Sequence, residues 1–266
     1  MICVLGDAHL DVVVRLLGPV APDTDTPSRT SVGVGGQAAN VAAWVAALGG
    51  QSRLLFARGT DLAADLVTAE LAGRGVELAG PVVAGSTGVV VSLSDGGATR
   101  SMLTDRGVGP RFAAPDLRES WLDGCSWLHL PAYSLVSDPI SGAALAAVAA
   151  AATRSARLSI DLSSTAALTR FGAARFARLL VALSPDVVLG TEAEMALVGE
   201  LRGPDLVVKL GAAGVRAGGR HHPAAATDAV DSTGAGDAFA AGYLLGGVPR
   251  GLAAAARAVA TMGGMP

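Results

Sequence analysis

The chain has 266 residues, 51% of them hydrophobic, and a formal net charge of −3, so it can bury the core of one large α/β domain. It lacks the basic surplus of proteins that bind a phosphate backbone, which argues against nucleic acid as a partner. Its two cysteines, Cys3 and Cys125, are too few for a disulfide framework or a cysteine metal cluster. We find no signal peptide and no apolar run long enough to span a bilayer, and we therefore expect a cytoplasmic protein without a membrane partner.

Apolar runs typical of strands alternate with longer stretches typical of helices along most of the chain. Strands are predicted at residues 2–5, 54–57, 127–130, 157–161, 187–189 and 206–210. Helices are predicted at residues 38–48, 62–72, 140–152, 173–183, 236–245 and 252–262, with Asp61 as the N-cap of the second. Such alternation predicts a parallel sheet with helices on both faces.

Two segments, residues 11–16 and 87–103, break this alternation because they are rich in β-branched residues and are not followed at once by a helix. The second contains Ser94-Asp95-Gly96-Gly97, a strong hairpin-turn signal. We expect the two segments to form a small antiparallel sheet standing off the main domain. No long linker or internal repeat is present, so residues 1–266 are predicted to form a single domain.

The first glycine-rich motif runs from Gly33 to Asn40 and contains Gly-x-Gly-x-x-Ala, which superficially matches a dinucleotide fingerprint. A dinucleotide loop should follow the first strand directly, whereas here a long excursion separates the two. The alternative is a substrate site, since the adjacent Gly35 and Gly36 let a ligand approach the backbone closely. Asn40 is a polar amide in an otherwise apolar helix, and its partner is either its own backbone or a ligand hydroxyl; spacing leaves both open.

The second motif runs from Asp231 to Asp237 and precedes an apolar helix. Asp237 is the only ionisable carboxylate between Asp231 and Arg250. In a purely structural interpretation, the Asp237 carboxylate complements the dipole of the helix that follows. Its functional interpretation is a base beside a phosphate bound at the helix N-terminus, an arrangement that suits phosphoryl transfer to a hydroxyl.

Two further features carry candidate roles. Lys209, the only lysine, ends a predicted strand before Gly211 and Gly214, which indicates either an ordinary strand-turn-strand or a segment beside a bound nucleotide. Thr191 and Glu194 have the spacing of a helix capping box.

Two of these motifs carry a family resemblance. Residues 35–42 with Leu48-Gly49 resemble the first signature of PfkB sugar kinases, and residues 231–237 with Phe239 and Gly242 resemble the second. The resemblance covers essentially the whole chain, from Gly6 and Asp11 to its last residues, 263–266. It implies a ribokinase-like three-layer α/β sandwich with a mostly parallel sheet and a small β lid, formed by segments 11–34 and 86–105. It also implies transfer of the γ-phosphoryl group of MgATP to a hydroxyl of a sugar or nucleoside, without a Walker A motif.

The resemblance assigns roles to individual residues. Asp237 would be the base, and the backbone N–H groups of Gly234, Ala235 and Gly236 would stabilise the transferred group. The substrate would be held by Asp11, Gly35, Gly36 and Asn40; the nucleotide by Lys209, Gly211, Gly214 and Thr233; and Mg²⁺ by Glu194, directly or through water. Members of the family are often activated by K⁺ through carbonyls near Asp231, and the lid is a candidate surface for a homodimer.

The sequence departs from the family pattern at three places, with Thr191 where asparagine is usual, Leu162-Ser163-Ser164 where Pro-Asn is usual, and Gln37 where lysine is frequent. These departures affect the metal arrangement and the choice of substrate. Two alternatives to an active kinase therefore accompany the prediction: a catalytically degenerate, nucleotide-binding regulatory relative, and an NAD-dependent oxidoreductase that uses the Gly33 loop.

Overall fold

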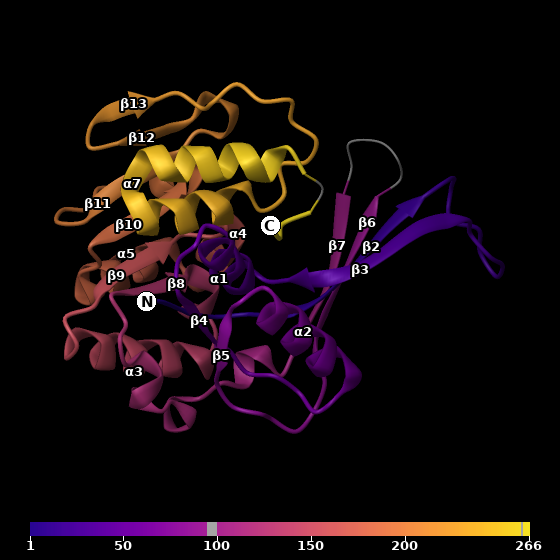
Figure 1. Cartoon of the computed structure of the whole chain (residues 1–266), viewed down its shortest axis with the longest axis horizontal. Helices are drawn as coiled ribbons and strands as arrows, with labels where there is room; N and C mark the ends of the chain where they lie inside the picture. Colours follow the sequence, from indigo (N-terminus) through magenta and orange to yellow (C-terminus); the bar gives the residue numbers. More distant parts are fainter. Residues whose placement is uncertain (95–99, 262) are drawn as a thin grey trace.

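The computed structural model describes residues 1–94, 100–261 and 263–266, and within these it contains two sheets. The larger sheet has nine strands in the order β13-β12-β11-β10-β9-β8-β1-β4-β5 (Figure 1). Neighbours from β5 to β11 run parallel, and only β12 and β13 are antiparallel. The strands are β1 (Ile2–Leu5), β4 (Ser52–Leu55), β5 (Glu77–Ala79), β8 (Trp127–Pro131), β9 (Arg157–Asp161), β10 (Val187–Thr191), β11 (Asp205–Lys209), β12 (Val215–Ala217) and β13 (Arg220–His222). The predicted mostly parallel sheet is therefore confirmed.

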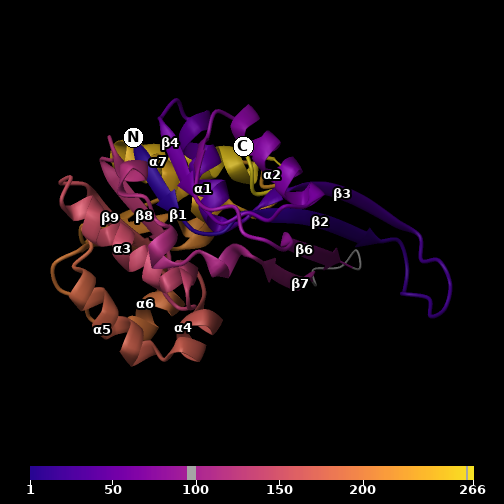
Figure 2. The same cartoon turned by 90° about the horizontal axis from the view of Figure 1, so that it is seen from below.

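Helices cover both faces of this sheet and complete a three-layer sandwich (Figure 2). Because side chains alternate along a strand, β1 sends Ile2 and Val4 to one face and Cys3 and Leu5 to the other. The first face packs against α1 (Gln37–Ala47), α2 (Leu62–Gly73) and α7 (Ala235–Val259). The second packs against α3 (Ile140–Ala152), α4 (Thr165–Phe171), α5 (Ala173–Leu183) and α6 (Glu192–Val198). No helix of the described chain is long and apolar enough to cross a membrane.

The smaller sheet projects from one side of the sandwich (Figure 1). Its four described strands lie in the order β3-β2-β6-β7, with bounds Ser28–Gly35, His9–Leu16, Thr87–Ser94 and Arg100–Gly107. It was expected to be antiparallel, but its central pair, β2 and β6, runs parallel because the two hairpins lie side by side. In the turn predicted at residues 94–97, residues 95–97 lie outside the described residues.

The two helices predicted at residues 236–245 and 252–262 are both present within α7 (Ala235–Val259), where the non-helical Gly246 and Gly247 separate them. The predicted end at residue 262 falls outside the described residues. The seven-residue helix α4 was not predicted, and α6 was predicted only by the capping box at its start. The short 3₁₀ helices at Gly109–Arg111, Ala114–Asp116, Glu119–Leu122, Ala132–Ser134 and Gly211–Ala213 were not predicted either.

Candidate active site

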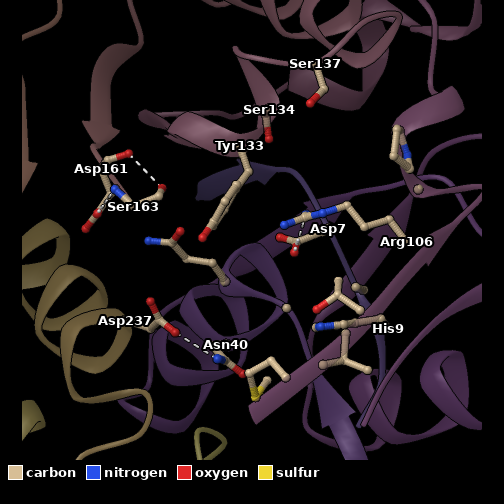
Figure 3. A pocket seen from close by; sticks show the side chains of 18 of the residues that line it. Asp7, His9, Asn40, Arg106, Tyr133, Ser134, Ser137, Asp161, Ser163 and Asp237 are labelled. Carbon is tan, nitrogen blue, oxygen red and sulfur yellow. Dashed lines mark hydrogen bonds and ion pairs between the residues drawn. The ribbon is translucent and has the colours of Figure 1, made fainter. Parts of the chain in front are cut away.

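A pocket of about 500 Å³ lies where the carboxyl ends of the parallel strands meet the smaller sheet (Figure 3). We call it the first pocket. Ligands of open α/β sheets bind at this edge, because several loops converge there. Asp161 and Lys209 reach the first pocket from the ends of β9 and β11, and Arg106 reaches it from β7. Asn40 and Asp237 reach it from the first turns of α1 and α7.

Asp237 and Asn40 contact each other directly across 197 residues of sequence. The Nδ2 group of Asn40 donates a hydrogen bond to Oδ2 of Asp237 at 2.8 Å (Figure 3). The Oδ1 atom of Asn40 is buried and has no hydrogen-bond partner within the described chain. The sequence left two partners open for the Asn40 side chain, its own backbone or a ligand hydroxyl. In the structure its amide donates instead to the side chain of Asp237, the predicted base.

The environment of Asp237 favours a carboxyl group that can take up a proton near neutral pH. Burial raises the pKa of Asp237 to about 7, and the nearby carboxylates Asp161 and Asp7 act in the same direction. The hydrogen bond from Asn40 and the charge of Lys209 oppose this increase. A carboxyl with such a pKa is suited to general-base chemistry, because it is partly ionised and can still bind a proton firmly.

Lys209 and Asp161 form an ion pair beneath the first pocket. Lys209 Nζ lies 2.7 Å from Asp161 Oδ2, and the Asp161 side chain is fully buried. Burial works against the charge of Lys209, but the attraction of Asp161, with Glu194 and Asp237 further away, outweighs it and raises the pKa of Lys209. Lys209 is therefore a permanent cation at neutral pH.

Gly35 and Gly36 allow a close approach of protein atoms. A Cβ atom at Gly35 would lie 2.2 Å from Oδ2 of Asp11, and Gly36, with a φ of 109°, lies against the carbonyl of Asp7. Gly36 lines the first pocket, whereas Gly35 makes room for the Asp11 carboxylate. The assignment of both glycines to the substrate stays a prediction.

A second pocket of about 450 Å³ shares Lys209 with the first. It is mostly apolar and lies between the β11–β12 turn, residues 224–229 and the buried side of α7. The predicted nucleotide residues Gly211 and Gly214 line it, as do Ala235 and Gly236. Thr233, predicted with them, lines the first pocket instead. Gly234, the N-cap of α7, lines neither pocket and packs against the backbone of Gly264.

Comparison with known proteins places this geometry in a family. The family model described as pfkB family carbohydrate kinase matches residues 1–263. The chain belongs to the pfkB family of carbohydrate kinases. This confirms the predicted family and the predicted class of enzyme, a phosphotransferase that acts on a hydroxyl group.

Individual relatives agree with this assignment over almost their whole length. The chain is 31% identical to an ATP-dependent ribose-1-phosphate kinase of Halopiger xanaduensis, covering 92% of this chain and 84% of the relative. It is also 31% identical to a fructokinase of Klebsiella pneumoniae, covering 96% and 88%.

Solved structures share the fold at lower sequence identity. Adenosine kinase from Sinorhizobium meliloti superposes with a TM-score of 0.86 at 21% identity, covering 100% of this chain and 95% of that one. A candidate ribokinase II from Escherichia coli, solved with ATP and Mg²⁺, gives a TM-score of 0.83 at 21% identity, covering 99% and 94%. The ribokinase-like fold predicted from the sequence is confirmed.

The Gly33 loop of this kinase is not a dinucleotide turn. Gly33 lies within β3 of the smaller sheet, and the loop joins β3 to α1 rather than following β1. The geometry therefore removes the structural basis of the oxidoreductase alternative.

Glu194 completes the predicted capping box and also reaches the first pocket. Its Oε2 atom accepts a hydrogen bond from the backbone N–H of Thr191 at 2.7 Å, and its own N–H donates to Thr191 Oγ1 at 3.3 Å, which is the predicted capping box. The side chain also lines the first pocket. Within the described residues, no three His, Cys, Asp or Glu side chains form a metal-binding group. The assignment of Glu194 to Mg²⁺ stays a prediction.

Sequence reasoning missed several residues on the wall of the first pocket. Asp7 follows β1 and Asp161 ends β9, so a carboxylate at the carboxyl end of a buried strand was the available signal. Tyr133 and Ser134 belong to a short 3₁₀ helix after β8, and no pattern in the sequence marks them.

Proposed function

We propose that this kinase transfers the γ-phosphoryl group of ATP to a hydroxyl of a sugar or nucleoside bound in the first pocket, with Asp237 as the base. The observation that carries this proposal is the position of the first turn of α7 between the two pockets. Gly236 lines the second pocket, and the next residue, Asp237, lines the first. A phosphoryl group that passes from one pocket to the other must therefore pass this turn.

The second pocket is the proposed site of ATP. Its walls are rich in alanine and include Phe239 and Val259 from α7, and such an apolar slot suits a flat base. Lys209 lies at its boundary with the first pocket, where the phosphates of a nucleotide would need a cation. The Escherichia coli neighbour that was solved with ATP supports a nucleotide site in this fold.

The proposed reaction needs little covalent chemistry from the protein. The acceptor hydroxyl gives its proton to Asp237 while its oxygen attacks the γ-phosphorus, and ADP leaves. The backbone N–H groups of Gly234, Ala235 and Gly236 lie at the start of α7, where we propose that they stabilise charge on the transferred group; the Ala235 N–H also donates to the carbonyl of Ser232 at 3.3 Å. Asn40 keeps the carboxylate of Asp237 oriented through its hydrogen bond.

Mg²⁺ is the proposed metal, because the oxygen donors of the first pocket fit a hard cation. Glu194 would hold it, directly or through water, and the ion would neutralise charge on the ATP phosphates. For K⁺, carbonyls near Asp231 are the proposed site. We propose further that the smaller sheet, segments 11–34 and 86–105, acts as a lid that excludes water, and that this cytoplasmic enzyme pairs through it. Exposed apolar side chains on the sheet, such as Val32 and Leu103, support such pairing.

Arg106 favours a second candidate for the acceptor, a sugar that already carries a phosphate. Its guanidinium points into the first pocket, lies over the Tyr133 ring at 4.6 Å and makes one long contact of 3.6 Å with Asp7 (Figure 3). Within the described residues, most of its donors therefore remain available to an anionic group. The Halopiger relative, named for ribose 1-phosphate, agrees with this alternative.

A phosphoryl-transfer assay tests the proposal. ATP and Mg²⁺ would be offered with D-fructose, ribose 1-phosphate, D-ribose or adenosine, and ADP and the phosphorylated product would be measured. We expect turnover with at least one acceptor and a higher Tm with a non-hydrolysable ATP analogue. Arg106→Met should raise the KM for ribose 1-phosphate and leave that for fructose unchanged. A protein that binds the ATP analogue yet phosphorylates none of these acceptors would instead be the degenerate regulatory relative.

A further inference from the structure

Asn40 is packed, next to its contact with Asp237, against a segment far away in sequence, residues 263–266. A Cβ atom at Gly264 would lie 2.9 Å from Nδ2 of Asn40 and 3.4 Å from its Cγ. Real Cβ atoms do not approach so closely to other heavy atoms, so the backbone of Gly264 fills the space beside the amide group. The same Nδ2 atom donates to Asp237.

Trp44 fixes the position of Gly264. It lies four residues after Asn40 in α1, and this spacing places both side chains on the same face of the helix. The indole Nε1–H of the fully buried Trp44 donates a hydrogen bond to the carbonyl of Gly264 at 2.9 Å. The guanidinium of Arg257 lies 5.5 Å from the ring centre and packs over it.

Gly264 also contacts the loop that precedes α7. A Cβ atom at Gly234 would lie 2.5 Å from Cα of Gly264, so the two backbones touch. Gly234, with a φ of 73°, is the N-cap of α7. The neighbouring Gly263 donates its N–H to Oδ2 of Asp231 at 3.1 Å. One short stretch of backbone thus packs against both motifs of the site, the start of α1 and the start of α7.

We propose that Gly264 and Trp44 are positioning residues for phosphoryl transfer, which hold Asn40 and Gly234 from a single point and so fix the base relative to the backbone N–H groups of α7. This inference rests on the proposed role of Asp237. It predicts that a substitution at Gly264 changes the pKa of Asp237, although no hydrogen bond joins the two residues in the described chain.

The direction of the effect follows from the groups around Asp237. Besides burial, its proton affinity is set by Asn40 of α1, Asp161 of β9, Lys209 of β11 and Asp7 after β1. The Asn40 hydrogen bond stabilises the carboxylate. A methyl group at Gly264 would displace Nδ2, weaken this bond and raise the pKa of Asp237.

Lys209 offers a measurement that needs no acceptor. It is the only lysine of the chain, so labelling with ¹⁵N-lysine gives a single Nζ signal by NMR, and this ammonium senses the charge of Asp237. In the wild-type protein the signal should shift with a midpoint near pH 7, and Asp237→Asn should remove that transition. In Gly264→Ala, Trp44→Phe and Asn40→Ala, the midpoint should move up by about one pH unit.

A double variant separates positioning from a general loss of structure. If Gly264 acts through Asn40, Gly264→Ala should cause no further shift in an Asn40→Ala background, because the displaced amide is already gone. Gly73→Ala and Trp127→Phe are the controls: Gly73 has open space around it, and no hydrogen bond is seen at the Trp127 indole in the described chain. Both should keep the wild-type midpoint.

The outcomes separate this inference from the proposed function. Unchanged midpoints in folded Gly264→Ala and Trp44→Phe, or additive shifts in the double variant, would overturn the positioning role alone. Trp44→Phe removes the indole hydrogen bond without introducing a larger side chain, so it tests the inference even if Gly264→Ala does not fold. If Asp237→Asn keeps full turnover, the role of Asp237 fails, whatever happens at Gly264.

Discussion

Lys209 and Asp161 depend on each other: the Lys209 ammonium lies 2.7 Å from a carboxylate that is completely buried. Lys209→Met should therefore destabilise the protein by about 3–5 kcal/mol, because it leaves Asp161 charged and unpaired. Adding Asp161→Asn should restore most of the stability but not the affinity for ATP. Urea unfolding and ATP titration measure the two quantities.

The exposed pair Arg216–Glu192, with the two atoms 3.0 Å apart, is the matched control for this experiment. Arg216→Met should cost less than about 1 kcal/mol, since solvent screens such pairs. A double variant at 161 and 209 that is as unstable as Lys209→Met would show that Lys209 stabilises the fold by packing rather than by charge.

Glu194→Gln separates the structural role of Glu194 from its role toward Mg²⁺. Glutamine at this position can still complete a capping box with Thr191, so the helix start should be kept while the negative charge is lost. We expect an unchanged Tm and a several-fold higher Mg²⁺ concentration for half-maximal activity. Thr191→Ser, which keeps the cap and the charge, is the control. Equal Mg²⁺ dependence of Glu194→Gln and wild type would leave only the capping role.

The ionisation of Asp237 should be visible in the pH dependence of stability. Its pKa is about 7 in the folded protein against a usual value of 3.8, so the folded state binds this proton more tightly than the unfolded state does. Asp237 therefore does not lower the free energy of unfolding below about pH 4, where it is protonated in both states. Above that pH its ionisation destabilises the folded protein increasingly, until the pH exceeds about 7.

Asp237→Asn removes this pH-dependent loss of stability, because asparagine cannot ionise. The stability of Asp237→Asn relative to wild type should be greater at pH 8 than at pH 4.5 by more than about 1 kcal/mol, the equivalent of one pKa unit. Asp25→Asn, in the exposed loop between β2 and β3, is the control and should show no such trend. A difference that is flat with pH would mean that Asp237 ionises as an ordinary exposed carboxyl.

The sequence was sufficient for the elements with strong local signals. Periodicity located the strands of the parallel sheet except the short edge strand β5, and Asp61 caps α2 as predicted by accepting the N–H of Ala64. β3 was not predicted as a strand, because its Ser, Thr and Gly residues are mostly exposed and receive their order from pairing with β2. The two helical parts of α7 were predicted separately because Gly246, Gly247 and Pro249 are ordinary helix terminators, and the non-helical Gly246 and Gly247 do separate them.

For the site, motifs identified which residues matter but not which residues touch. Asn40 and Asp237 were both selected from the sequence, yet their contact joins positions 197 residues apart and no local pattern encodes it. The pairing of Lys209 with Asp161 and the packing of Gly264 on Asn40 are of the same kind. Each depends on which strand ends and helix starts meet at the edge of the sheet.

The rate of phosphoryl transfer by Asp237→Asn tests the central claim most directly. Asparagine keeps the shape of the side chain and can still accept the hydrogen bond from Asn40, but it cannot take the proton of the acceptor. A general base contributes roughly 10²–10⁴-fold in rate, whereas a carboxylate that only complements the helix dipole contributes about 0.3–1 kcal/mol to stability. With the acceptor that the wild-type enzyme uses best, we predict that kcat falls at least about 100-fold while ATP still binds. A folded Asp237→Asn protein with a kcat close to that of the wild type would contradict the mechanism.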